Sequence, residues 1–377
     1  MRIGVVVHGP NIIDSGYVVK IIDLLKEFGE VFCRLGGTMG RTAVIDNFLE
    51  DTIDISRKLV PSDSIRLFHD DNVDVIFLLN YGKSHVTGQV FGYKVVNHFL
   101  DKIEDSPTPI IQIERPGEED GSVILWTGVC VDLTSEIASR LNLKIVTPEE
   151  IYNEHFKEDD VDNAKKERIV HGVSPDENIM VNSVVIGKSN SDKLTLIAEN
   201  GYIVDIKGGV LKEHGLEKLG KIDLDKAIIK TGLLRKAKVT PRIINAEHSS
   251  DLFKIAFLDH AGEDVYKYKD VDAVVTIGDD TTLISSDILY RFNIPIIGIT
   301  DGDLDKVVED GFKADKSVIF ELESGHDDIV GGEIFNEIFK GNFILELPKS
   351  KGNISDIKNS IIEILNNINC KYNIKDI

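Results

Sequence analysis

The sequence contains few of the residues that support disulfide, metal-cluster or membrane architectures. Its 377 residues include only three cysteines, Cys33, Cys130 and Cys370, which lie far apart and form no C-x-x-C pair. This spacing argues against a disulfide framework, a zinc site or a cysteine-ligated cluster. No apolar run approaches the length of about 18 residues that a membrane span needs, and residues 1–8 indicate a first strand rather than a signal peptide. We therefore expect a cytoplasmic protein without a membrane-spanning segment.

Positive charge is also scarce. The chain has 43 Lys and Arg against 64 Asp and Glu, which gives a formal net charge of −21. A surface of this sign repels nucleic acids and anionic membranes, so neither is an expected partner. A small anionic ligand would have to be held by a local pocket. The length and the hydrophobic content of 42% predict two or three domains with cores of their own.

Short β-branched apolar runs alternate with amphipathic stretches at both ends of the chain. Such strands interleaved with helices predict a mostly parallel sheet covered on both faces. We predict an α/β protein with a Rossmann-like or flavodoxin-like domain at 1–146, a charged connector at 147–179, a small β-rich domain at 180–241 and an α/β domain at 242–377. In the β-rich part, Asn200-Gly201 between two apolar runs predicts a tight hairpin, and residues 224–230 predict a helix.

The segment 274–303 predicts a strand–loop–helix–strand–loop unit. A loop of Gly, Asp and Thr at a strand end can direct backbone N–H groups at a phosphate, and clustered carboxylates suit Mg²⁺. The candidate nucleotide or phosphate ligands are Gly278, Asp280, Thr281, Thr282, Asp301 and Gly302, with Asp280 and Asp301 as candidate Mg²⁺ ligands. The structural alternative is that the acids cap helices and fill polar turns.

The sequence from Gly278 to Thr282 resembles the phosphate loop of the NAD kinase and phosphofructokinase families, which reads Gly-Gly-Asp-Gly-Thr after a buried strand. The resemblance continues into residues 295–304, which are similar to a second loop of NAD kinases. It implies that Asp279 is the catalytic aspartate and that Thr281 binds phosphate. Two family glycines are replaced, by Ile277 and Asp280. The β-rich lobe also precedes this unit, whereas in NAD kinases it follows.

A second glycine-rich loop, Gly36-Gly-Thr-Met-Gly-Arg-Thr42, follows an expected strand near the N-terminus. Close backbone approach, hydroxyl donors and a guanidinium are what a phosphate or carboxylate site requires. Loops after parallel strands gather on one edge, so those beginning at His8 and Asn80 are expected beside it. The candidate second anion site comprises Gly36, Gly37, Thr38, Gly40, Arg41, Thr42, His8, Asn80 and Lys83. The alternative is a tight turn with Arg41 in a salt bridge, and a structural role for His8.

The middle region carries further cations beside glycines, namely Lys212, His214, Lys230 and Arg235. These side chains either reach over a domain cleft or form the polar surface of a glycine-rich connector. His248 and His260 stand among acids, but their spacing matches no familiar transition-metal motif.

Over nearly its full length the chain resembles an uncharacterised family of methanogenic archaea. The resemblance is carried by His8-Gly-Pro, by Gly36–Thr42, by Lys212-Glu-His-Gly215 and by Gly278–Thr282. It implies a role in archaeal metabolism, with methanogenesis-linked steps as the contextual expectation, and assigns no activity.

Two functions remain open from the sequence. One is an enzyme acting on a nucleotide or phosphorylated metabolite, in its kinase version using Asp279 as the base and ATP or another nucleotide with Mg²⁺. The other is a non-catalytic sensor or assembly factor that binds a nucleotide or cofactor and acts through a protein partner. A homo-oligomer is compatible with both.

Overall fold

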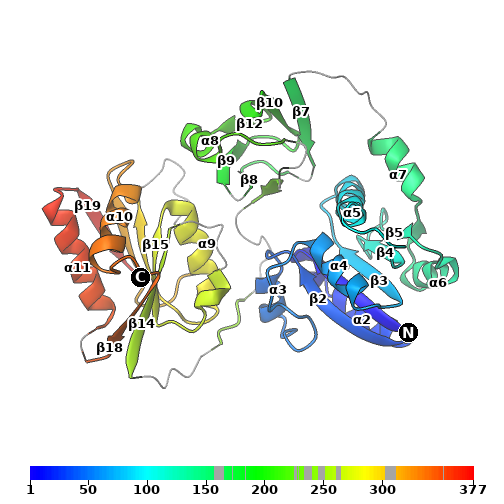
Figure 1. Ribbon diagram of the computed structural model, residues 1–377, viewed down its shortest axis with the longest axis horizontal. Coiled ribbons are helices and arrows are strands. Elements are labelled where there is room, and N and C mark those ends of the chain that lie inside the picture. Colours follow the sequence, from blue (N-terminus) through cyan, green and yellow to red (C-terminus); the bar gives the residue numbers. More distant parts are fainter. Residues whose placement is uncertain are drawn as a thin grey trace. The chain divides into compact units, whose positions relative to one another are not determined.

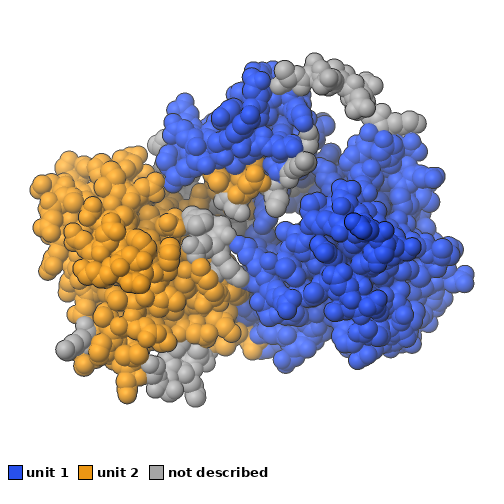
Figure 2. Space-filling model, in the orientation of Figure 1, with its two compact units in different colours: residues 1–179, 186–231, 235–240 blue, residues 180–185, 232–234, 241–377 orange. Residues whose placement is uncertain are grey.

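The computed structural model describes residues 1–156, 165–171, 173–182, 184–224, 227, 229–232, 240–244, 251–259, 265–301, 311–350 and 352–377. The described chain forms two compact units (Figure 2). Unit 1 comprises residues 1–179, 186–231 and 235–240, and unit 2 comprises residues 180–185, 232–234 and 241–377. Both contain parallel strands and covering helices, which confirms the predicted α/β class. The finer domain boundaries stay predictions.

Unit 1 begins with a six-stranded sheet in the order β2-β1-β3-β4-β5-β6 (Figure 1). The strands are β1 (Arg2–His8), β2 (Glu30–Gly36), β3 (Val75–Asn80), β4 (Ile110–Glu114), β5 (Ser122–Thr127) and β6 (Lys144–Ile145). The first four run parallel, and β5 is antiparallel to β4. All six residues of β3 are buried, as expected of a central strand covered on both faces.

Helices cover this sheet on both faces. They are α1 (Asn11–Asp14), α2 (Tyr17–Lys26), α3 (Arg41–Asp46), α4 (Pro61–Asp70), α5 (His85–Leu100), α6 (Val131–Leu141) and α7 (Pro148–His155). One core contains Val5, Val7 and Phe77 with α1 and α2, and the other contains Val6 and Leu78 with α4 and α5. Because alternate residues of a strand point to opposite faces, each apolar strand feeds both cores.

The β-rich segment contains two sheets, ordered β11-β10-β7 and β12-β9-β8-β13. Strand β10 is antiparallel to both β11 and β7, and β12 is antiparallel to β9. Its elements are β7 (Lys165–Val170), β8 (Asn178–Val181), β9 (Val184–Ser189), β10 (Leu194–Glu199), β11 (Tyr202–Lys207), β12 (Gly209–Leu211), α8 (Glu213–Leu219) and β13 (Ile229–Thr231). The predicted Asn200-Gly201 hairpin is confirmed, with φ values of 54° and 85°.

Two predictions in this region were wrong. Ile229–Thr231 belongs to a strand beside β8 and not to a helix, because sheet pairing overrides the local pattern. Lys165–Val170, which we assigned to the connector, pairs as an edge strand with β10. Its charged side chains remain largely exposed.

Unit 2 is built on a second six-stranded sheet, ordered β18-β14-β15-β16-β17-β19. Its elements are β14 (Leu252–Leu258), the 3-10 helix η1 (Val265–Tyr268), β15 (Ala273–Ile277), α9 (Asp279–Tyr290), β16 (Ile296–Thr300), β17 (Val318–Leu322), α10 (Asp327–Glu337), β18 (Ile344–Pro348), α11 (Ile354–Asn367) and β19 (Tyr372–Asp376). The four central strands are parallel, and both edge strands are antiparallel. Among the described residues, no helix has the length and apolar character needed to cross a membrane.

Candidate functional site

The carboxyl ends of four neighbouring parallel strands form one row of residues in unit 1. Gly36 of β2 pairs with His8 of β1, His8 with Asn80 of β3, and Asn80 with Glu114 of β4. Side chains of residues paired in a parallel sheet project to the same face. The structure therefore brings together His8, Asn80 and the glycine loop, as the sequence predicted, and adds Glu114.

A chain of hydrogen bonds runs along this row. His8 Nδ1 lies 2.7 Å from Asn80 Oδ1, and Asn80 Nδ2 donates to Glu114 Oε2 at 2.7 Å. Glu114 also accepts from Gln112 Nε2 at 2.8 Å and from the Gly82 amide at 2.7 Å. Because Asn80 donates to the carboxylate, its oxygen faces His8, and the imidazole proton lies on Nδ1. No described residue hydrogen-bonds to His8 Nε2, which is left as an acceptor.

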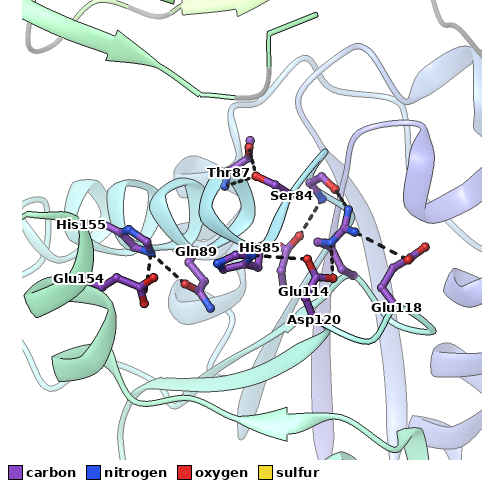
Figure 3. Close-up of polar contacts among 11 residues, drawn as sticks. Ser84, His85, Thr87, Gln89, Glu114, Glu118, Asp120, Glu154 and His155 are labelled. Atoms are coloured by element: carbon purple, nitrogen blue, oxygen red, sulfur yellow. Dashed lines mark hydrogen bonds and ion pairs between the residues drawn. The ribbon is translucent and has the colours of Figure 1, made fainter. Parts of the chain in front are cut away.

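Helix α5 covers this row. The ring of Phe91 stacks on the His8 imidazole with centroids 4.0 Å apart. A Cβ atom on Gly88 would lie 1.9 Å from the carboxylate carbon of Glu114, so only glycine permits this approach. Figure 3 shows Glu114 with Asp120 and Glu118 nearby and with Gln89 and His155 further along. The chain of hydrogen bonds extends to the single tryptophan, because Trp126 Nε1 donates to Gln112 Oε1 at 2.9 Å.

Burial shifts the two ionisable groups of the row in opposite directions. Burial lowers the pKa of His8 to about 4; the bond to Asn80 raises it in part, and the charge of Lys230 lowers it further. Burial raises the pKa of Glu114 to about 6, although its hydrogen bonds to Gly82, Asn80 and Gln112 and the charge of Arg115 act the other way. Near neutral pH the row therefore holds a neutral imidazole beside an ionised carboxylate, an arrangement in which Nε2 can accept a proton.

The glycine loop after β2 presents unpaired backbone donors. Gly37 has a φ of 94°, and its amide donates to the Leu59 carbonyl at 2.7 Å. The next three amides, of Thr38, Met39 and Gly40, have no acceptor among the described residues. Consecutive amides of this kind form an anion-binding concavity. The Gly37 backbone approaches His8 closely, because a Cβ there would be 3.8 Å from His8 Cδ2.

The cations predicted for this site occupy different environments. Arg41 is 1% exposed and Thr42 is 7% exposed, so both belong to the packed base of the loop. Helix α3 is only six residues long and contributes little dipole. Lys83 Nζ bonds both carboxylate oxygens of Glu177, at 2.7 and 2.8 Å. Arg41, Thr42 and Lys83 therefore stay candidate ligands whose contacts are already partly internal to the fold.

The predicted C-terminal loop lies at the carboxyl edge of the sheet in unit 2. Gly278 has a φ of 89°, precedes α9, and donates its amide to the Ile299 carbonyl at 2.8 Å. Thr282 is fully buried, and its Oγ1 lies 2.8 Å from Thr276 Oγ1. The Oδ2 atom of Asp301 accepts the Gly325 amide at 2.8 Å. Thr282 and Asp301 thus make contacts that stabilise the fold.

Acidic side chains dominate this second edge. Asp279 and Asp280 form the first turn of α9, Thr281 behind them is 5% exposed, and Asp327 Oδ2 lies near Gly278. Within the described ranges, no group of three or more His, Cys, Asp or Glu side chains is placed to hold a metal ion. Gly302, His248 and His260 lie outside the described residues. Catalysis by Asp279 and Mg²⁺ binding by Asp280 and Asp301 stay predictions.

Sequence reasoning missed Glu114, Gln112 and Trp126. The available signal was the polar residue inside the apolar run Ile110–Glu114, since a glutamine in a fully buried strand needs a partner. Glu114 also follows a core strand directly, as His8 and Asn80 do.

Comparison with known proteins identifies the family. A protein family described as "uncharacterized protein conserved in archaea" (DUF2117) matches residues 5–342. An uncharacterized protein of Methanocaldococcus jannaschii is 52% identical over 343 residues, which cover 88% of this chain and 90% of that protein. No solved structure shows a significant match. These matches extend over both units, and the chain belongs to this archaeal family.

Proposed function

We propose that this protein is an enzyme that binds a small anionic metabolite at the edge of the first sheet and uses His8 as a proton acceptor. One observation carries the proposal: an oriented, neutral imidazole lies beside a loop with three consecutive unpaired amides. The amides would bind the anionic group, and Nε2 would take a proton from a neighbouring group of the same ligand.

The hydrogen-bond chain suits such a base. When Nε2 accepts a proton, the resulting imidazolium still donates from Nδ1 to Asn80, and the ionised Glu114 lies next in the chain. The carboxylate stabilises the new positive charge without moving. Phe91 restrains the ring from the helix side. A bound anion would favour the imidazolium further, because an opposite charge raises the pKa of histidine.

The ligand class that we propose is a nucleotide or phosphorylated metabolite, in the cytoplasm of a methanogenic archaeon. The kinase version, with Asp279 as base and ATP with Mg²⁺, remains a narrower proposal for the edge of unit 2. Thr282 and Asp301 already make contacts within the fold, which leaves them less available to bind ATP and Mg²⁺. For that edge we therefore favour the alternative, a nucleotide- or cofactor-binding sensor that acts through a protein partner. Self-association into a homo-oligomer is compatible with either version.

Substitution of Met39 tests the loop selectively. The Arg41 amide donates to the Thr38 carbonyl at 3.1 Å, and Gly40 has φ −81° and ψ −8°, so residues 38–41 form a type I turn with Met39 at its second position. Proline is favoured there and lacks the N–H group. Met39→Pro should therefore fold and lose one anion donor, whereas Met39→Ala keeps the donor.

The experiment is a thermal-shift screen of the full chain against nucleotides, sugar phosphates and carboxylates, with and without Mg²⁺. A ligand at about 100 times its Kd stabilises the native state by about 2.7 kcal/mol, so a binder raises Tm measurably. We expect a hit for wild type and Met39→Ala, a smaller shift for Met39→Pro, and loss of ligand turnover in His8→Gln. A screen without any anionic hit, or equal shifts in Met39→Pro and Met39→Ala, would contradict the site.

A further inference from the structure

Gln112 lies fully buried at the centre of β4, and its side-chain amide makes three hydrogen bonds. Nε2 donates to the Gly88 carbonyl at 3.0 Å and to Glu114 Oε2 at 2.8 Å, and Oε1 accepts from Trp126 Nε1 at 2.9 Å. A backbone carbonyl can only accept a hydrogen bond, and an indole N–H group can only donate one. The contacts with Gly88 and Trp126 therefore fix the same orientation of the amide.

This orientation makes Gln112 a permanent donor to Glu114. A side-chain amide can ordinarily turn over and offer either its oxygen or its NH₂ group to a neighbour. For Gln112 the turn would place oxygen against the Gly88 carbonyl and NH₂ against the Trp126 indole, so two hydrogen bonds would be lost. Glu114 Oε2 therefore always meets a donor from β4. Donation of this kind favours the ionised form of a carboxyl group.

The charge state of Glu114 determines which group Asn80 presents to His8. An ionised Glu114 accepts from Asn80 Nδ2, which leaves the Asn80 oxygen for His8 Nδ1. A protonated Glu114 instead needs an acceptor for its own O–H group. Asn80 can supply one by turning its oxygen to Glu114, and its NH₂ group then faces Nδ1. The imidazole proton would in that case lie on Nε2, which could no longer accept a proton.

Other polar groups around Glu114 do not take over this role in the part of the chain that the structure describes. Gln112 also contacts Oε2 but cannot turn, and the Gly82 amide and the Arg115 guanidinium can only donate. Ser122 is paired with Glu114 across β4 and β5, so its side chain projects to the same face. The buried Ser122 hydroxyl nevertheless has no hydrogen-bond partner among the described residues.

We propose that Gln112 is a positioning residue for the base: its anchored amide keeps Glu114 an acceptor, and Asn80 transmits this state so that His8 Nε2 can accept a proton. The inference rests on the proposed function and extends it to a residue that acts only through Glu114 and Asn80. It also gives a reason for a glutamine at the centre of a buried strand, where an apolar side chain would be expected.

Nitrogen-15 chemical shifts of the His8 ring, recorded against pH on the ligand-free full chain, test the assignment. In wild type, Nε2 should be unprotonated near neutral pH and become protonated as pH falls through about 6, the pKa to which burial raises Glu114. Gln112→Met removes the donor and keeps a side chain of similar length. The pH of the change should then rise by about one to two units, the shift expected when an ionised group loses one hydrogen bond.

Ser122→Ala is the matched control, because it removes a buried hydroxyl beside Glu114 that bonds to no described residue. The pH of the change should be the same in this variant as in wild type. Gln112→Met leaves the Trp126 N–H group without its acceptor, which lowers stability. If that variant does not fold, Gln112→Met combined with Trp126→Phe removes both partners of this bond and should show the same rise.

The outcomes separate this inference from the proposed function. A pH of change that is the same in wild type and in the Gln112 variants would overturn the role of Gln112 and leave His8 as a proton acceptor. An equal rise in Ser122→Ala would also overturn it, because any disturbance beside Glu114 would then suffice. A wild-type Nε2 that is protonated near neutral pH would overturn both the inference and the proposed base.

Discussion

At the residue scale, His8 and Glu114 show how one buried hydrogen-bond chain can hold a neutral imidazole and an ionised carboxylate near neutral pH. Asn80 joins them through two 2.7 Å contacts and can offer an acceptor to one and a donor to the other. Its orientation is fixed from the carboxylate side, since Glu114 accepts hydrogen bonds and donates none when ionised. The proton position on His8 is therefore decided two residues away along the row.

The lowered pKa of His8 predicts a specific pH dependence of stability. Its folded pKa of about 4 lies below the ordinary 6.5, so its contribution is present above pH 6.5 and is lost as pH falls toward 4, where the unfolded chain binds the extra proton. As the pH falls across that window, the unfolding free energy of His8→Gln should increase relative to that of wild type by up to about 1.4 kcal/mol per pH unit. Urea denaturation at several pH values measures this difference, with exposed His98→Gln as the control.

Glu114 contributes with the opposite sign. Its folded pKa of about 6 exceeds the ordinary 4.5, so its contribution is present below pH 4.5 and is lost as pH rises through 6. Between pH 4.5 and 6, the unfolding free energy of wild type should therefore rise less steeply with pH than the contribution of His8 alone would give. A difference between wild type and His8→Gln that does not vary between pH 6.5 and 4 would contradict the assignment for His8.

Replacement of Glu114 by glutamine should exchange donor and acceptor in the hydrogen bonds that join residue 114, Asn80 and His8. The Gly82 backbone amide can only donate, so it should keep the new carbonyl oxygen on its side, where Glu114 Oε1 now accepts it at 2.7 Å. The new NH₂ group would then donate toward Asn80, Asn80 would turn its own NH₂ toward His8, and the imidazole proton would move to Nε2. Gln112 cannot adapt in the same way, because it also donates to the Gly88 carbonyl and accepts from Trp126. One facing donor pair therefore remains and should cost about 1–3 kcal/mol in stability.

Nitrogen-15 chemical shifts of the His8 ring measure this change directly. Wild type should show a protonated Nδ1 and an unprotonated Nε2, and Glu114→Gln should show the reverse. The control is Glu119→Gln, at an exposed position in the loop after β4, which should keep the wild-type tautomer. The same tautomer in wild type and in Glu114→Gln would mean that Asn80 does not relay the orientation.

At the element scale, helix α5 can cover the row only because two of its residues lack side chains. A Cβ at Gly92 would lie 1.7 Å from Gln112 Oε1, just as a Cβ at Gly88 would overlap Glu114. Glycine within a helix ordinarily lowers stability. In α5 the two glycines allow the helix to pack directly on polar side chains of β4, and Gln112 of that strand donates to the Gly88 carbonyl.

Substitution of these glycines should reverse the ordinary effect of alanine in a helix. Gly88→Ala should destabilise unit 1 by about 2–3 kcal/mol, because the Glu114 carboxylate must leave its three donors. The matched control is Gly332→Ala in α10, where an added Cβ meets nothing within 4 Å. That variant should gain about 0.5–1 kcal/mol. Chemical denaturation of both variants would show opposite signs, and a stabilised Gly88→Ala would disprove the packing.

At the scale of the whole molecule, a contact between distant segments connects two parts of unit 1. Lys83 and Glu177 are separated by 94 positions in sequence, and their side chains are 36% and 2% exposed. A carboxylate buried to this extent is stable only when it is paired and hydrogen-bonded. The contact therefore joins the β-rich segment to the loop after β3 more firmly than a surface ion pair would.

A double-mutant cycle on this pair measures that connection. Lys83→Met should destabilise the protein by about 2–3 kcal/mol, because it leaves the Glu177 charge buried without its cation. Lys83→Met combined with Glu177→Gln should recover part of the loss, with a coupling energy of about 1–2 kcal/mol. The control cycle uses the exposed pair Lys26 and Asp23, whose side chains are 58% and 62% exposed. It should give at most about 0.5 kcal/mol, and equal coupling in the two cycles would refute the buried link.

Local patterns in the sequence were sufficient for several features. The apolar runs ending at His8 and Asn80 predicted parallel strands followed by polar loops at their carboxyl ends, because that pattern reflects burial on both faces. Asn200-Gly201 predicted its hairpin, because only a few residue types accept two positive φ values. The prediction of a helix at Ile229–Thr231 failed, because the pairing of a short segment with a distant strand leaves no local sign.

The sequence by itself determined the α/β class, the acidic charge and the strand-end loops, since each follows from composition or short-range periodicity. Only the tertiary structure decided which side chains meet. Asn80 reaches His8 across 72 positions and Glu114 across 34, and Arg41 is buried at the base of its loop. Such encounters depend on strand order and register, which arise from the packing of the whole sheet and are not encoded in any one segment.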